Sequence, residues 1–191
     1  MTRMLQLAWK TFRPRKPVPG MGVLDPSVTE MRVHPGDLDV LLHVNNGVYL
    51  QMADVARWNF VADLDGSTRL GDRRWYPVVA ASTVKYRRSL QLWDRFRITT
   101  RVLGWDERIV YLEQVFTRGD DVCATAWLAG RFLSKDGSRI PMPDVIALLG
   151  QDAPPASPPL PAEVTAWARS LDVAHRSPAP TGPTPGTTSL P

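Results

Sequence analysis

The sequence contains a single cysteine, Cys123, and only three histidines among its 191 residues. One cysteine excludes an internal disulfide and is typical of a reducing compartment, so we expect a cytoplasmic protein. Cys123 alternates within an apolar stretch, which predicts a buried packing residue. His34, His43 and His175 lack the spacing of zinc ligands. We therefore predict neither a metal site nor a bound cofactor.

Long apolar runs are missing as well. No stretch of about 18 apolar residues occurs, so no membrane-spanning helix is predicted. The apolar segment 4–9 is too short for the core of a signal peptide, and no cleavage site follows it.

Acidic residues are absent from positions 1–20, which hold five basic side chains. Residues 21–150 hold 16 basic and 16 acidic side chains, so the sequence pI of ≈ 9.6 arises from the N-terminal arm. This distribution does not indicate a nucleic-acid-binding domain, and no nucleic-acid partner is expected.

Composition divides the chain into three parts, namely a basic amphipathic or flexible leader over 1–20, one domain over 21–150, and a proline-rich, mostly disordered tail over 151–191. The tail holds ten of the 18 prolines, and we expect only a helical turn around 163–171 within it.

The leader has two interpretations. As a short helix it would place Leu5 and Trp9 on one side, with Arg3 and other cations flanking them, which suits a weak membrane-surface contact through residues 1–16. Alternatively, it is a flexible or loosely docked segment.

A long central helix is expected from Asn45 or Asn46 to about Asp63, because asparagine is a good helix N-cap. Apolar residues recur along one helical face, namely Tyr49, Met52, Ala53, Ala56, Phe60 and Leu64. The opposite face carries Gln51, Asp54 and Asn59.

Five strands are expected, over residues 27–34, 78–86, 95–102, 109–116 and 122–133, followed by a short helix over 144–149. Residues 65–77 suit a loop of mixed charge. Strands and helices do not alternate as a doubly wound sheet requires. The order therefore predicts an α+β fold, in which a curved antiparallel sheet wraps around one long central helix.

A polar loop from Asp37 to Asn46 leads into the central helix. It carries two carboxylates and a histidine. Free N–H groups at a helix N-terminus can hold developing negative charge while a carboxylate acts beside them. The loop is therefore the candidate for chemistry.

The pattern Asp-x-Asp-x-x-x-His-Val-Asn-Asn-x-x-Tyr-Leu over residues 37–50 resembles the hotdog-fold acyl-CoA thioesterases of the 4-hydroxybenzoyl-CoA thioesterase type. Segments 80–90 and 101–106 resemble the branch called thioesterase superfamily member six, and the resemblance covers roughly 28–148. It implies a hotdog fold, hydrolysis of an acyl-CoA to a free acid and coenzyme A, and a homodimer or dimer of dimers with the active site across the interface.

Roles in the loop follow from the resemblance. It implies that Asp39 is the base or nucleophile and that the helix N-terminus near Asn46 holds the oxyanion. His43 would orient Asp39 or the thioester carbonyl, and Asn45 and Tyr49 would line the substrate site. Asp39 could instead cap its own turn and His43 could be structural.

Neighbouring positions refine this picture. Asp37 is expected to be structural, pairing with an arginine or with loop amides. Leu42 stands where many thioesterases of this type have glycine. Arg87 and Arg88 are candidates for the coenzyme A phosphates, or they form a solvated strand end. Pocket depth is expected to depend on helix and strand side chains, namely Met52, Ala56 and Val79.

Two rival functions remain open. One is a non-catalytic acyl-thioester or lipid-binding protein. The other is an enoyl-thioester hydratase or dehydratase, although the usual Asp-x-x-x-x-His spacing is absent between either aspartate and His43.

Overall fold

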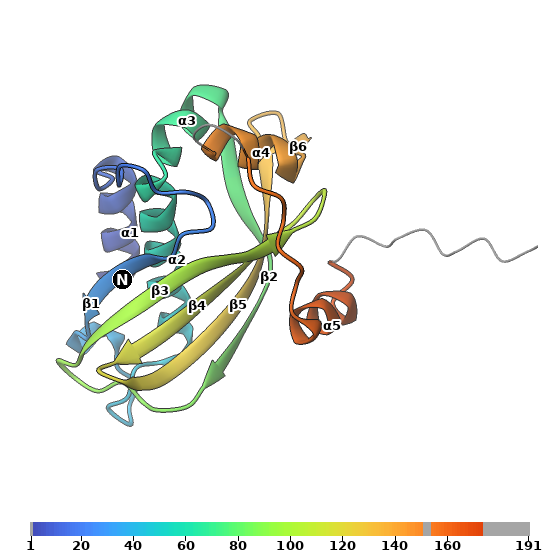
Figure 1. The fold of residues 1–191 in the computed structure, drawn as a ribbon. Coiled ribbons are helices and arrows are strands. Elements are labelled where there is room, and N and C mark those ends of the chain that lie inside the picture. Colours follow the sequence, from blue (N-terminus) through green and yellow to red (C-terminus); the bar gives the residue numbers. More distant parts are fainter. Residues whose placement is uncertain (1, 151–153, 174–191) are drawn as a thin grey trace, which may run out of the picture.

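The computed structural model describes residues 2–150 and 154–173, which form a curved antiparallel sheet with helices on both faces (Figure 1). The strands are β1 (Ser27–Arg32), β2 (Trp75–Tyr86), β3 (Arg95–Trp105), β4 (Val110–Arg118), β5 (Asp121–Ser134) and β6 (Arg139–Ile140). The helices are α1 (Thr2–Phe12), the 3-10 helix η1 (Pro35–Asp37), α2 (Asn46–Asp63), α3 (Gly66–Arg73), α4 (Met142–Leu149) and α5 (Ala162–Ser170).

The sheet order is β1-β3-β4-β5-β2, and β6 pairs with β5. This arrangement around α2 confirms the predicted α+β architecture, with β1 and β2 as the two edges (Figure 1). Along β3 the buried and exposed side chains alternate, so one face of the strand packs inward. Within the described residues, no helix is both long and apolar enough to span a membrane.

Helix α2 begins where the sequence predicts, because the Asn45 side chain accepts a hydrogen bond from the Gly47 amide at 2.9 Å. The predicted apolar face is buried. The prediction that Asn59 lies on the other, polar face is wrong. Asn59 is buried, and its amide donates to the Thr29 hydroxyl at 3.0 Å. Helix α2 lies between the sheet and α1, so little of its circumference meets solvent (Figure 1).

The prediction of a loop over residues 65–77 is also wrong. This segment contains α3, and β2 starts at Trp75. The helix is held by tertiary contacts that local sequence does not reveal. Leu70 is buried, and the Arg69 guanidinium donates to the Leu148 carbonyl of α4 at 3.1 Å. Gly66 has no room for a side chain, since a Cβ there would lie 2.8 Å from the Val61 carbonyl oxygen.

The N-terminal helix α1 packs along α2 (Figure 1). The predicted flanking position of Arg3 is wrong, because Arg3 is buried against the domain. Its charge is matched there by Asp37, so burial is tolerated. Further along, Arg15 forms an ion pair with buried Asp63 and donates to the Ser27 hydroxyl at 2.8 Å.

Residues 157–168 cover part of the outer face of the sheet. The Ser157 hydroxyl accepts from the Trp105 amide at 2.8 Å and donates to the Trp105 carbonyl at 2.7 Å. Helix α5, at the place of the expected helical turn, packs Val164 and Ala168 onto an apolar cluster of the sheet. The division into leader, domain and tail remains a prediction, and residues 174–191 lie outside the described part of the chain.

Candidate functional site

Residues 37–45 form a small hairpin, called here the Asp39 hairpin, that connects η1 to α2. At its base the Asn45 amide donates to the Asp37 carbonyl at 2.9 Å, and nearer the tip the Asp39 amide donates to the His43 carbonyl at 2.8 Å. These two bonds are consecutive rungs of a narrow antiparallel ladder. They fix Asp39 relative to the helix that follows.

The Asp39 carboxylate is half-buried, and its two oxygens differ in their hydrogen bonds. Oδ1 accepts hydrogen bonds from the Leu41 amide at 2.8 Å and from the His43 amide at 3.2 Å. Asp39 therefore caps its own turn. Oδ2 has no hydrogen-bond partner in the described part of the chain, so one oxygen remains available for a ligand.

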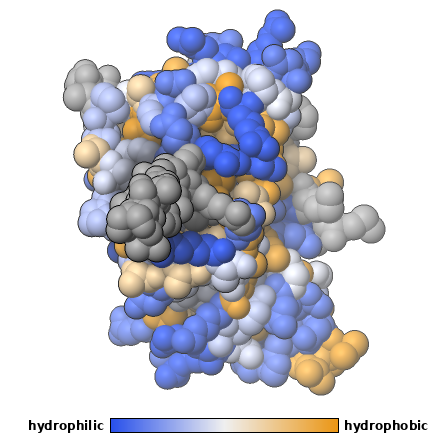
Figure 2. Space-filling model, turned by 90° about the vertical axis from the view of Figure 1, so that its right-hand side faces the viewer, coloured by the Kyte–Doolittle hydropathy of each residue, from blue (hydrophilic) through white to orange (hydrophobic). Residues whose placement is uncertain are grey.

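The tip of the hairpin is apolar and exposed. Val40, Leu41 and Leu42 are 97%, 71% and 70% exposed, and a hydrophobic corner projects at the bottom of the space-filling view (Figure 2). Leu42 has φ +61°, in the left-handed region that glycine adopts more easily. A glycine would adopt this backbone conformation without strain, which agrees with the glycine that the resemblance implies at this position.

The start of α2 carries amides that no helical carbonyl satisfies. The Asn46 amide donates no hydrogen bond to any described residue, while its carbonyl accepts from the Tyr86 hydroxyl at 3.0 Å. The Tyr49 and Tyr86 rings lie 5.1 Å apart, and the Tyr49 hydroxyl accepts from the Leu90 amide at 3.3 Å. Two tyrosines thus frame the positive end of the helix dipole.

The predicted residues His43, Asn45 and Asn46 lie together with Asp39 at the junction of hairpin and helix. His43 is half-buried, and its backbone pairs with Gln91. Its imidazole makes no hydrogen bond within the described residues. Both roles considered for His43, the orienting one and the structural one, therefore remain predictions.

Arg87 and Arg88 lie exposed just beyond the end of β2. Both backbone amides donate to the Cys123 carbonyl, at 2.8 and 3.1 Å. The Arg88 guanidinium pairs with Asp121 at 3.2 Å. Coenzyme A binding by these arginines is still a prediction.

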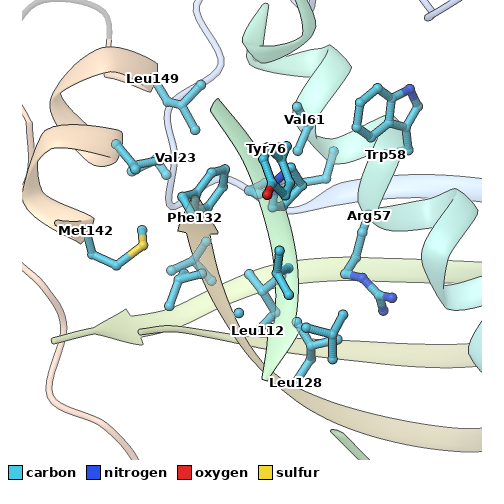
Figure 3. Close-up of a pocket in the computed structure, with 18 of the residues that line it drawn as sticks. Val23, Arg57, Trp58, Val61, Tyr76, Leu112, Leu128, Phe132, Met142 and Leu149 are labelled. Carbon is cyan, nitrogen blue, oxygen red and sulfur yellow. The ribbon is translucent and has the colours of Figure 1, made fainter. Parts of the chain in front are cut away.

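A cavity of about 450 Å³ lies between the later turns of α2 and the sheet, with α4 closing one end (Figure 3). Its walls are mostly apolar, with Phe132 from β5 and Met142 and Leu149 from α4 (Figure 3). The size and lining are typical of a small-molecule or acyl-chain pocket. Tyr76 of β2 and Trp58 of α2 stand at its side.

Two charged residues of α2, Arg57 and Asp54, reach the cavity wall. The Arg57 guanidinium donates to the Gln114 side-chain oxygen at 2.7 Å and pairs with Asp54. Gln114 is fully buried and donates in turn to the Ala53 carbonyl and the Thr100 hydroxyl, each at 3.0 Å. Burial lowers the pKa of Arg57 to about 10. The network satisfies the polar groups beside an apolar space.

Sequence reasoning missed most of this cavity. Of the three side chains expected to set pocket depth, only Val79 lines it, while Met52 and Ala56 belong to the core cluster that contains Tyr49 and Phe116. One signal was present in the sequence. Gln114 interrupts an apolar strand, and a buried amide there needs a polar partner such as Arg57.

The family model of the thioesterase-like superfamily matches residues 33–168. The match includes the Asp39 hairpin, α2, most of the residues that line the cavity, and α5 as far as Ala168. This chain belongs to the thioesterase-like superfamily.

Two curated relatives illustrate the similarity of this thioesterase-like protein. Protein THEM6 of Xenopus laevis is 36% identical over 140 residues, which cover 73% of this chain and 66% of that protein. The long-chain acyl-CoA thioesterase FadM of Escherichia coli is 32% identical over 89 residues, which cover 47% of this chain and 67% of FadM. For the THEM6 proteins of Drosophila melanogaster and Danio rerio, the aligned part covers only 42% and 56% of the relative.

Solved structures confirm the fold of the thioesterase-like chain. The probable thioesterase YbaW of Escherichia coli superposes with a TM-score of 0.60 at 24% identity, covering 65% of this chain and 99% of YbaW. A gentisyl-coenzyme A thioesterase superposes with a TM-score of 0.58 at 21% identity, covering 63% of this chain and 98% of that one. The curled sheet around α2 is a hotdog fold.

Proposed function

We propose that the protein hydrolyses an acyl-coenzyme A thioester to a free acid and coenzyme A, with Asp39 as the reacting carboxylate. The supporting observation is the free Oδ2 of Asp39 on a hairpin whose base is bonded to the N-cap of α2. In this proposal, the carboxylate and the Asn46 amide at the helix start serve one substrate carbonyl.

The proposed chemistry needs no cofactor. Asp39 takes a proton from water as the water oxygen bonds to the thioester carbon. Alternatively, its carboxylate attacks that carbon directly, and after the thiolate has left, a water hydrolyses the resulting acyl-aspartyl anhydride to the free acid and restores the carboxylate. The oxyanion that forms is held by the amide near Asn46. When the C–S bond breaks, the coenzyme A sulfur leaves and takes up a proton.

The acyl group would extend along α2 into the cavity. From Asn46 to Asp54, the first residue of α2 that lines the cavity, the helix rises by about 12 Å, at about 1.5 Å per residue. An extended chain advances by roughly 1.3 Å per C–C bond of about 1.5 Å. An acyl chain of about 9 carbons or more is therefore needed to reach the cavity wall, and we infer a preference for chains of this length or longer.

A second copy of the chain is the proposed protein partner. Strand β2 is a long sheet edge, and its Tyr76, Val79 and Tyr86 side chains are exposed. An exposed apolar edge of this kind is a template for pairing with another strand. We infer a homodimer, or a dimer of dimers, joined along β2.

The N-terminal helix supports the proposed weak membrane-surface contact. Leu5 and Trp9 are 72% and 58% exposed on α1, and the Arg13 guanidinium lies 4.9 Å from the Trp9 ring centre. Aromatic and cationic side chains together suit an anionic membrane surface. Co-sedimentation with anionic vesicles, reduced by Leu5→Ser with Trp9→Ser, would support this contact. A cytoplasmic location remains a prediction.

The main experiment measures thiol release from short, long and aromatic acyl-CoAs by the wild type and by Asp39→Asn. Asparagine keeps an oxygen to accept from the Leu41 and His43 amides, so the hairpin should persist while the carboxylate is lost. We expect turnover to fall by about 100-fold or more. Asp25→Asn is the matched control, because Asp25 also caps a loop amide, that of Gly22 at 2.8 Å. Turnover undiminished by Asp39→Asn would show that another group does the chemistry.

A non-catalytic acyl-thioester-binding protein is the second candidate. It is favoured by the capping bonds of Asp39 Oδ1, which give this residue a structural role without any reaction. Binding of a long acyl-CoA by the wild type, with no thiol release from any substrate, would establish this function instead.

A further inference from the structure

Arg3, in the first turn of α1, is joined to the loop that holds Asp39. The Arg3 Nε donates to Asp37 Oδ1 at 2.9 Å, and its Nη2 donates to Asp37 Oδ2 at 2.6 Å. The two side chains are only 3% and 0% exposed. A bidentate guanidinium–carboxylate pair fixes both the position and the orientation of its partners.

Asp37 in turn holds the segment after β1, the Asp39 hairpin and the start of α2. Its Oδ2 also accepts from the His34 amide at 2.8 Å, which holds the end of the β1 segment. Its carbonyl accepts from the Asn45 amide at 2.9 Å, which forms the base of the Asp39 hairpin. Asn45 is the N-cap of α2. Arg3, Asp37 and Asn45 therefore form a continuous chain of contacts from α1 to the start of α2.

Only a short ladder separates this base from the reacting carboxylate. The Asp39 amide is bonded to the His43 carbonyl one rung above the bond between Asp37 and Asn45. The tip beyond it is exposed and has little packing to hold it. The Leu41 and His43 amides orient the Asp39 carboxylate within its own turn, and the base helps to fix where this turn lies relative to α2.

We propose that Arg3 is a positioning residue of the site, and that α1 acts as a clasp that holds the Asp39 hairpin against the start of α2. This role rests on the proposed function of Asp39. Without Arg3, a buried carboxylate would lack its cation and would move toward water. The exposed tip of the hairpin is the segment best able to move with it.

The test compares Arg3→Met, Arg3→Lys and Arg15→Met in the full-length protein. Arg15 is the matched control, because it also joins the N-terminal segment to a buried aspartate, Asp63, but at the far end of α2. We expect Arg3→Met to lower kcat by about 10-fold to 100-fold with KM little changed, since small misplacements of reacting groups have effects of this size. Arg3→Lys should recover part of kcat, and Arg15→Met should leave it unchanged.

Hydrogen exchange of the Asn45 and His43 amides gives a second readout that needs no turnover. Both amides should exchange faster in Arg3→Met than in Arg15→Met when each variant is measured at a temperature equally far below its own unfolding midpoint. Equal exchange in the two variants would overturn the clasp, whether or not the wild type hydrolyses any thioester. Faster exchange in a protein without turnover would retain the clasp and reject the hydrolase. If Arg3→Met does not fold, the same exchange comparison is made between Arg3→Lys and Arg15→Met.

Discussion

The Tyr86 hydroxyl donates to the Asn46 carbonyl at 3.0 Å, which joins the last residue of the edge strand β2 to the first residue of α2. Because Asn46 carries the amide proposed to hold the oxyanion, Tyr86→Phe should lower kcat by several-fold. The free energy of unfolding should fall by only about 0.5–1 kcal/mol, as for one partly exposed hydrogen bond. Steady-state kinetics and urea unfolding measure the two effects. An unchanged kcat with lowered stability would limit Tyr86 to a structural tie.

Leu42→Gly should stabilise the protein. The left-handed conformation costs a residue with a Cβ about 1–2 kcal/mol, and the extra freedom of glycine in the unfolded chain offsets about 0.5–1 kcal/mol of the gain. We expect a net increase of about 0.5–1 kcal/mol in the free energy of unfolding. Leu41→Gly is the control, because Leu41 is equally exposed but has no positive φ. It should destabilise, and the same sign in both variants would contradict the strain at Leu42.

Gly130→Val should shorten the acyl chain that the protein accepts. Gly130 lines the cavity, and a Cβ there would meet the Val110 and Leu128 side chains at 3.4 and 3.5 Å, which is ordinary contact. The added methyls then occupy space that a long chain needs. We expect kcat/KM for long acyl-CoAs to fall by about 10-fold or more, with short chains little affected. Gly71→Val on α3, where a Cβ meets no atom within 4 Å, should change neither. Equal losses for all chain lengths would place the acyl group elsewhere.

Lysines in place of Ser82 and Thr83 should break the proposed dimer. Both residues lie exposed on β2, and charge on an edge strand opposes pairing with another strand. Light scattering after size exclusion should then give the monomer mass, and turnover should fall if the site spans the interface. Val28→Lys, an exposed position on the opposite edge β1, should keep the wild-type mass. A wild type that is already monomeric would remove the dimer from the proposal.

The buried thiol of Cys123 predicts the alkaline pH dependence of stability. Burial raises the pKa of Cys123, partly opposed by Arg118. The unfolded thiol therefore ionises first as the pH rises above its usual pKa of about 8.5. The unfolded state then binds fewer protons than the folded state, so the free energy of unfolding falls with rising pH. Urea unfolding across this range should show the decline, and Cys123→Ala should weaken it.

Local sequence was sufficient for the helix and the loop because their determinants lie close together along the chain. The N-cap Asn45, the spacing of buried residues on α2 and the capping bonds of Asp39 all involve neighbours within a few positions. The alternation along β3 likewise depends only on which residues face the core.

Contacts between distant segments were the ones that could not be predicted. The residues around Arg3 in the sequence do not indicate that Asp37 lies beside it. An arginine on an amphipathic helix was therefore predicted to lie at the surface. The cavity likewise depends on α4 closing one end of the space between α2 and the sheet. Helix α3 is held by Leu70 and Arg69 against α4, which overrides two glycines that favour a loop.

The strap formed by residues 157–168 has a consequence for where the chain can be cut. Ser157 bonds to both backbone groups of Trp105, and α5 covers an outer cluster that includes Leu103, Ile109 and Tyr111. A version ending soon after α4 would keep every strand of the sheet yet expose this apolar surface, which is a liability for self-association. The smallest unit that stays dispersed at high concentration should therefore extend beyond α5.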